Sequence, residues 1–183
     1  MLRFGGGGSV WRVFLFLGLV VVAVLVYAAF RPGMVRIQRA MVMDASAEKI
    51  FGLIDDFHCW REWAPQDKGD AGMVRTFSGA ASGVGAVSEW DGAGSTGKGR
   101  MTITESEPSR QIKVEVDFQK PFAVHNVNEF VLAPVGGRTR VTWTMLGPNI
   151  YMMKLMGVFV NMDRVMGRHF EMGLENLKKV AER

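Results

Sequence analysis

The hydrophobic positions of this chain change their spacing along its length. Residues 13–30 are an unbroken apolar run, residues from about 73 to 146 alternate between apolar and polar, and residues 149–182 carry apolar positions every three or four residues. Alternation predicts strands, whereas the last spacing predicts one amphipathic helix of about nine turns. Because neither apolar surface is stable in water, we expect the helix to pack on the sheet.

The middle of the chain predicts an antiparallel meander that follows a strand and two short helices. The first strand is expected at Met34–Met43, a helix at Ala47–Ile54 and a second helical turn within Asp55–Trp63, which Pro65 ends. Glycine-rich or proline-containing turns separate the remaining strands. We expect these at Met73–Ser78, Ala86–Trp90, Arg100–Glu107, Ile112–Gln119, Ala123–Ala133 and Thr139–Leu146.

The C-terminal helical pattern is rich in methionine. Its apolar stripe consists of Met152, Leu155, Met156, Phe159, Met162, Met166, Phe170, Leu174 and Leu177. Methionine is flexible and fills irregular spaces. The pattern therefore suggests a sheet that holds a helix beside an adaptable apolar cavity.

The N-terminal apolar run predicts a membrane-spanning helix. Val13–Phe30 contains no charged residue, and 18 helical residues extend about 27 Å, enough to cross a bilayer core. A cleaved signal peptide is the alternative, with Val26-Tyr27-Ala28 as the cleavage site, but the run is long for a signal and its small-residue ending is weak. We expect a tail and membrane anchor at residues 1–33 and one folded domain at residues 34–183.

The charge distribution argues against a nucleic-acid partner. The formal net charge is +4, but five of the 22 basic residues precede Ala40, which leaves 17 against 18 acidic residues in the domain. A nucleic-acid-binding domain would carry its basic residues on the folded part.

No motif in the chain predicts a metal site or a phosphate-binding loop. The three histidines match no zinc spacing, and the single Cys59, next to His58, is expected to be a half-buried thiol. Gly92–Gly97 fits the pattern G-x-G-x-x-G, and Gly92–Lys98 fits the first seven positions of a P-loop, whose eighth position is Gly99 instead of Ser or Thr. Both motifs require a helix after the glycines, but a strand is expected there. We expect a hairpin turn there, and no cofactor.

His125 is the one candidate for proton transfer. It lies in the strand pattern 122–130, where it could orient a ligand or carry a proton with a carboxylate such as Asp117 or Glu129. The alternative is a strand histidine bonded to the backbone or to a neighbouring carboxylate. No catalytic triad order or nucleophile elbow is present.

Aromatic and methionine residues are the better candidates for a ligand pocket. Tryptophan favours sites with one polar end, which a pocket mouth provides, although ordinary core packing is the alternative. The candidate ligand-binding residues are Trp60, Trp63, Trp90, Phe118, His125, Phe130, Trp143, Met156, Phe159 and Met166.

The element order and several segments resemble the START-like helix-grip superfamily (SRPBCC), in particular the bacterial polyketide cyclase/dehydrase and lipid transport proteins. The resemblance extends over most of Val35 to Glu182. It rests on Ala45–Phe57, Trp60–Pro65, Phe77–Gly79, Ser82–Val87, Trp90, Arg100–Glu105, Lys120–Phe122, Gly137–Trp143, Asn161–Asp163 and Phe170–Lys178.

The resemblance implies an α+β helix-grip fold, a curved antiparallel sheet of about seven strands around a long C-terminal helix. It also implies an apolar cavity for a lipid, polyketide or sterol. We therefore expect a single-pass protein of the bacterial inner membrane, anchored by residues 13–30, whose domain binds or carries a hydrophobic molecule without chemistry of its own. A cyclase/dehydrase-like enzyme that uses His125 and a carboxylate is the alternative.

Overall fold

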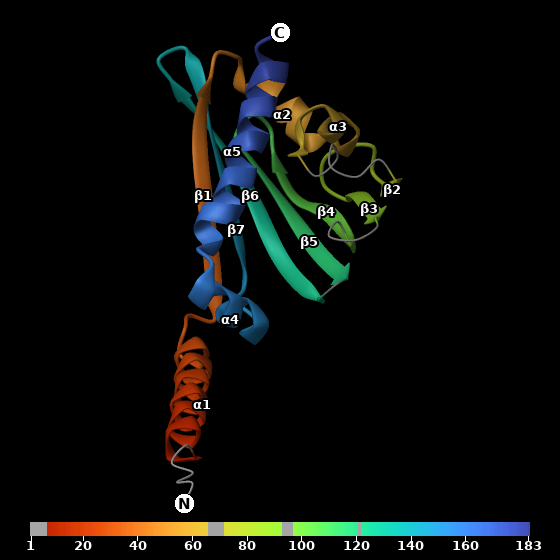
Figure 1. The fold of residues 1–183 in the computed structure, drawn as a ribbon. Helices are drawn as coiled ribbons and strands as arrows, with labels where there is room; N and C mark the ends of the chain where they lie inside the picture. The colour runs from red at the N-terminus through yellow and green to blue at the C-terminus, as the bar shows by residue number, and fades with distance from the viewer. Residues whose placement is uncertain (1–6, 66–71, 93–96, 121) are drawn as a thin grey trace, which may run out of the picture. The chain divides into compact units, whose positions relative to one another are not determined.

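The computed structural model of residues 1–183 describes all of them except residues 1–6, 66–71, 93–96 and 121 (Figure 1). The chain divides into two compact units, one made of residues 1–33 with 149–162 and the other of residues 34–148 with 163–183. The first unit therefore includes a segment that the sequence analysis assigned to the folded domain.

The first unit contains two helices, α1 (Gly7–Ala29) and α4 (Tyr151–Phe159). Within α1, the 19 residues Trp11–Ala29 have a mean hydropathy of 2.5 and are almost entirely exposed. Among the described residues, this is the helix that is long and apolar enough to cross a membrane. The core helix of a soluble protein would instead be largely buried.

The second unit is built on one antiparallel sheet of seven strands in the order β1-β7-β6-β5-β4-β3-β2. The α+β meander predicted from the sequence is confirmed, and each strand end lies within two residues of its expected position. The strands are β1 (Met34–Met43), β2 (Val74–Gly79), β3 (Ala86–Asp91), β4 (Lys98–Glu107), β5 (Gln111–Lys120), β6 (Val124–Val135) and β7 (Arg138–Pro148).

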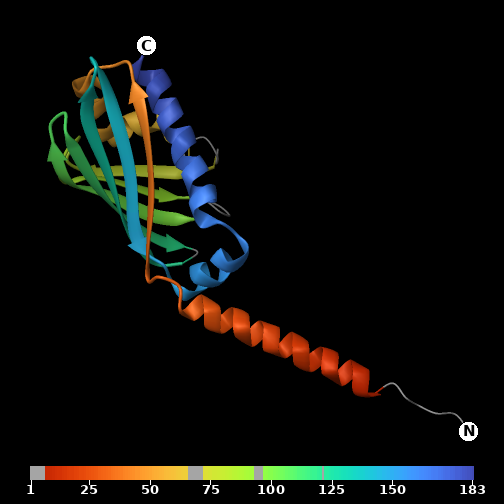
Figure 2. The same cartoon turned by 90° about the vertical axis from the view of Figure 1, so that its left-hand side faces the viewer.

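Short helices follow β1 as predicted. They are α2 (Ala47–Asp55), the 3-10 turn η1 (Phe57–Cys59) and α3 (Trp60–Trp63). Ser46 begins α2, because its Oγ accepts a hydrogen bond from the Lys49 backbone N–H at 3.2 Å. The C-terminal helix α5 (Met162–Ala181) lies beside β1 in the two views of Figure 1 and Figure 2.

The expectation of one continuous helix from residue 149 to 182 is wrong, because the helix breaks between α4 and α5. Val160 ends α4 with an extended backbone (φ −123°, ψ 130°). None of the α4 residues is buried, whereas α5 buries one side, including Phe170, Leu174 and Leu177. The apolar stripe is continuous in sequence, but its two parts belong to different compact units.

The core fills the end of the second unit where the short helices lie. Residues from the inner face of the sheet and from α5 are almost fully buried there and form one cluster. This packing fixes α5 on the sheet and leaves its first half beside the cavity described below. The fully buried members of this cluster include Trp60, Trp63, Phe57, Ile50, Ile54, Ile103, Ile112, Leu174 and Leu177.

An arginine on the inner face of the sheet also holds α5. Arg39 Nε donates to Glu171 Oε1 at 2.7 Å, and its Nη2 donates to Asp163 Oδ2 at 3.0 Å. This hydrogen bond lowers the pKa of Asp163 below its ordinary value. Gly167 faces the guanidinium so closely that a Cβ atom there would overlap it. The sequence analysis gave no role to these residues.

Candidate functional site

A cavity of about 460 Å³ lies inside the second unit, between the inner face of the sheet and the first half of α5. Strands β2 to β7 supply one side, and Val165 to Phe170 supply the other. Val165 lines the cavity although about half of it is exposed, so the cavity communicates with solvent there. The described lining residues are Trp60, Pro65, Met73, Arg75, Trp90, Met101, Val116, Phe118, Asn128, Trp143, Met145, Val165, Met166, His169 and Phe170.

Strand register explains why these residues from distant positions meet. Arg75 lies opposite Trp90, Trp90 opposite Gly99, and Gly99 opposite Phe118. Because cross-strand partners point to the same face of a sheet, this row projects into the cavity.

Gly99 provides space for Trp90. A Cβ atom at Gly99 would overlap the Trp90 ring and lie 2.7 Å from the Asp117 carbonyl oxygen. Packing against Trp90 therefore requires glycine at position 99, the end of the glycine-rich stretch. The predicted β3–β4 hairpin is confirmed by the antiparallel pairing of these strands, while residues 93–96 of its turn lie outside the described residues.

Three aromatic residues form the part of the cavity next to the core. The rings of Trp143 and Phe170 stack with centroids 4.2 Å apart, which joins β7 to α5. Trp143 Nε1 donates to Asn128 Oδ1 at 3.0 Å, and Trp60 Nε1 donates to the Ile54 carbonyl oxygen at 2.8 Å. Both indole N–H groups are hydrogen-bonded within the protein. The expectation that these tryptophans direct their polar end toward a solvent-exposed pocket mouth is therefore wrong for Trp60 and Trp143.

The cavity also contains three polar side chains. Arg75 Nη1 donates to the buried Ser88 Oγ at 2.9 Å. Because Asn128 Oδ1 accepts from Trp143, the amide NH2 of Asn128 is the group that can donate to a ligand. Burial lowers the pKa of His169, which favours the neutral ring. The described lining residues include no carboxylate.

The ten residues proposed from the sequence occupy different places. Trp63 and Phe130 are fully buried in the core, with their rings in contact at 6.2 Å between centroids, and neither is among the described lining residues. Met156 and Phe159 belong to α4 in the other unit and are 50% and 74% exposed. The residues that line the cavity are Trp60, Trp90, Phe118, Trp143 and Met166.

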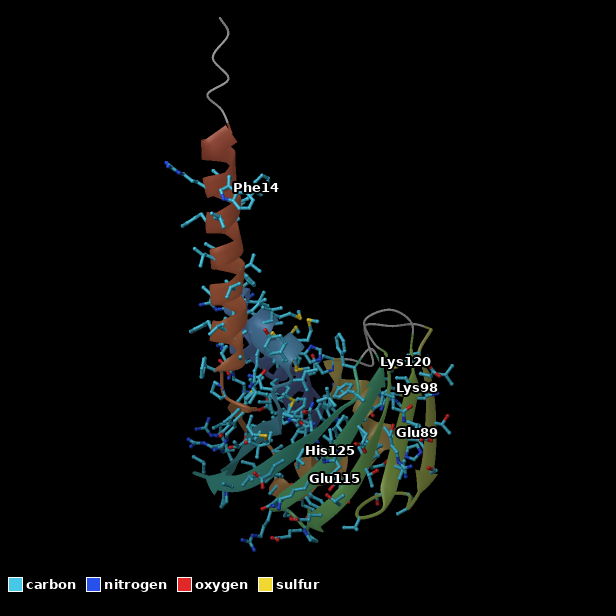
Figure 3. All side chains as sticks on the ribbon, turned by 90° about the horizontal axis from the view of Figure 1, so that it is seen from below. Phe14, Glu89, Lys98, Glu115, Lys120 and His125 are labelled. Atoms are coloured by element: carbon cyan, nitrogen blue, oxygen red, sulfur yellow. The ribbon has the colours of Figure 1, made fainter. Side chains whose placement is uncertain are left out.

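His125 lies on the outer face of the sheet, contrary to the expectation of a cavity histidine (Figure 3). Phe118 points into the cavity, so Asp117 points outward, and His125 is the cross-strand partner of Asp117. His125 Nδ1 lies 2.7 Å from Asp117 Oδ1, and both side chains are about half exposed. The alternative interpretation, a strand histidine bonded to a neighbouring carboxylate, describes this position.

His58 and Cys59 lie outside the described cavity lining as well. His58 Nδ1 lies 2.7 Å from Asp56 Oδ1, and its ring contacts Phe77. Burial raises the pKa of the half-buried Cys59 thiol, which makes it a poor nucleophile.

The sequence analysis missed the polar lining residues. Arg75 and Asn128 each occupy a polar position in a strand, and only the pairing with Trp90 and Met145 shows that they face inward. His169 lies one residue before the buried Phe170, at the edge of the apolar stripe on α5. This position in the sequence could have indicated that His169 borders the interior. Met101 and Met145 also line the cavity, but in the sequence nothing distinguishes them from other apolar strand residues.

Comparison with known families matches residues 34–182 to the model described as polyketide cyclase/dehydrase and lipid transport. The chain belongs to this family. The match covers the second unit except for Arg183, together with α4, and excludes α1. Comparison with curated proteins gives no match.

Solved structures show the same fold at low sequence identity. A Chromobacterium violaceum protein is 18% identical, with a TM-score of 0.57 over 83% of this chain and 99% of that one. The Aha1 dimer of Colwellia psychrerythraea is 19% identical, with a TM-score of 0.54 over 81% of this chain and 96% of that one. The di-domain ARO/CYC protein StfQ from the steffimycin biosynthetic pathway is 12% identical, with a TM-score of 0.60 over 99% of this chain and 62% of that one.

Proposed function

We propose that this protein is a membrane-anchored binding or carrier domain for a hydrophobic small molecule or lipid. The observation that carries the proposal is the cavity of about 460 Å³, bounded mostly by apolar and aromatic side chains. Its volume falls within the range of ordinary small-molecule sites, about 300–1,000 Å³. Of the residues proposed from the sequence, Trp60, Trp90, Phe118, Trp143 and Met166 are the ones we assign to ligand contact.

The polar lining residues give the ligand an orientation. Arg75, Asn128 and His169 can each donate a hydrogen bond, and the described lining residues offer no carboxylate. A ligand oxygen that accepts hydrogen bonds would therefore bind beside them, while the apolar part of the ligand contacts the methionines and aromatic rings.

Contacts at the end of α1 support a retained membrane anchor. Tyr151 Oη donates to the Leu25 carbonyl oxygen at 3.1 Å, and Leu25 precedes the candidate cleavage site at Ala28. A cleaved signal peptide needs no such bonds to the remainder of the chain. Anchoring would keep the domain close to the bilayer, where apolar ligands partition.

The exposed position of His125 gives no support to an enzyme that uses this residue for proton transfer. In the carrier proposal, His125→Leu leaves ligand occupancy unchanged, because the residue is not among those around the cavity. His169→Leu should lower occupancy about fivefold, since it removes a side chain whose hydrogen bond to the ligand would be worth roughly 1 kcal/mol. The reverse order of effects would contradict this assignment.

Native mass spectrometry of the full chain, purified from its host membranes in mild detergent, tests the proposal. We expect a bound apolar molecule that organic solvent extracts. An empty protein that also fails to bind a fluorescent fatty acid would contradict the proposal.

A further inference from the structure

Helix α4 carries an apolar surface that its own unit does not cover. Its nine residues include a single charge, Lys154, and none of them is buried. Met152 is 46% exposed, Met156 50% and Phe159 74%. Large apolar side chains gathered in this way mark a surface that contacts a partner or a membrane.

The exposed residues share one side of the helix. Met152, Met156 and Phe159 follow one another at intervals of four and three residues, which places them in one row. At about 100° per residue, Lys154 points away from this row. The helix therefore has an apolar side and a side that carries its one charge.

Hydrogen bonds hold α4 at the C-terminal end of α1. Tyr151 Oη donates to the Leu25 carbonyl oxygen, and Arg31 Nη1 donates to the Gly157 carbonyl oxygen. The Asn149 backbone N–H donates to the Gly33 carbonyl oxygen at 2.8 Å. All of these residues belong to the same compact unit.

This attachment sets the depth of α4 in a bilayer. The 19 residues Trp11–Ala29 extend about 28 Å, close to the thickness of the hydrocarbon core. Leu25 lies about 6 Å along the axis from the last residue of α1. A helix bonded between Leu25 and Gly33 is therefore level with the boundary between acyl chains and headgroups.

We propose that α4 is an interfacial helix that lies in this boundary, with Met152, Met156 and Phe159 directed into the lipid. The proposal rests on the proposed anchoring by α1, whose own side chains, such as Phe14 near its N-terminal end, are exposed (Figure 3). Tyr151 has the amphipathic side chain that is common at membrane interfaces. The bilayer is the favoured occupant because α4 is bonded to the end of the spanning helix while Met152, Met156 and Phe159 stay exposed.

Spin labels on the full chain test this assignment. The background is Cys59→Ser, reconstituted in vesicles of phosphatidylcholine and phosphatidylglycerol, with one added cysteine per variant. We compare Phe159→Cys with Lys154→Cys on the same helix, Val21→Cys in α1 and Arg110→Cys in the β4–β5 turn. Accessibility to oxygen and to an aqueous nickel chelate is measured by power saturation.

We expect the label at 159 to favour oxygen over the chelate, at a depth between those at 21 and 110, and the label at 154 to be more accessible to the chelate. If the label at 159 is as accessible to the chelate as the label at 110, while the label at 21 is in lipid, then α4 is not an interfacial helix. The membrane anchor α1 would still be supported by that result. Exclusion of both reagents at 159, with spin–spin broadening between copies, also overturns it, because a second copy then covers α4. An aqueous label at 21 contradicts the anchor itself.

Discussion

At the scale of single residues, two glycines and an arginine determine how closely the helix and the strands approach. Gly99 leaves room for the Trp90 ring, and Gly167 leaves room for the Arg39 guanidinium. Neither position needs an unusual backbone conformation, so the reason for glycine is space and not flexibility. Side-chain contacts of this kind depend on strand pairing and helix placement.

Gly99→Ala should destabilise the domain by about 1–3 kcal/mol, because the new methyl group forces Trp90 out of its position. Urea unfolding of the full chain in detergent, followed by tryptophan fluorescence, measures the change. Gly52→Ala is the matched control, since a Cβ atom at Gly52 in α2 meets nothing within 4 Å. Equal unfolding midpoints for both variants would contradict the role of Gly99.

Arg39→Met should lower the urea midpoint at pH 7, because α5 loses its bonds to the sheet through Asp163 and Glu171. The pKa of Asp163 is lowered in the folded protein, so its contribution is present above its ordinary value of 3.8 and is lost as the pH falls further. The difference in urea midpoint between the wild type and Arg39→Met should therefore become smaller below pH 3.8.

Arg110→Met is the control for this series, because Arg110 is 79% exposed and its ion pair with Glu107 joins only neighbouring residues. We expect its midpoint to stay close to that of the wild type at both pH values. A difference between wild type and Arg39→Met that does not change with pH would show that the arginine acts through packing alone.

At the scale of elements, the helix break at Val160 divides the apolar stripe into two parts with different surroundings. The part in α5 packs on the sheet and borders the cavity through Val165, Met166 and Phe170. The part in α4 stays exposed. The apolar periodicity predicted helix in both parts, but it does not specify what each part contacts.

Met166→Trp should reduce ligand occupancy at least tenfold, because the larger side chain occupies the cavity beside Phe170. Met172→Trp on the same helix is the matched control, since Met172 is 50% exposed and is not among the described lining residues. Native mass spectrometry measures occupancy, and the unfolding midpoint of each variant shows whether it folds. Full occupancy of a folded Met166→Trp variant would contradict the assignment of this cavity.

At the scale of the whole molecule, α1 distinguishes an anchored protein from a secreted one. In the anchored form the residues before Ala28 stay attached, and the protein remains in the membrane fraction after alkaline carbonate extraction. Peptide mapping of that fraction should recover the α1 sequence. A protein that is released by carbonate and begins after Ala28 would show that the run is a signal peptide.

The sequence predicted the seven strands, the short helices and their order, because alternation and turn residues are local signals. It also placed Trp60, Trp90 and Met166 among the candidates that border the cavity. It placed His125 there as well, because alternation within one strand does not identify which of the two faces points inward.

By itself the sequence determined the periodicities, and with them the apolar N-terminal helix, the meander and the helical C-terminus. Only the tertiary structure decided that Arg75, Asn128 and His169 meet in one cavity, that His125 points away from it and that the stripe breaks at Val160. The physical reason is that a local pattern specifies which side of an element is apolar. The partner of that side depends on strand register and on residues far away in the chain.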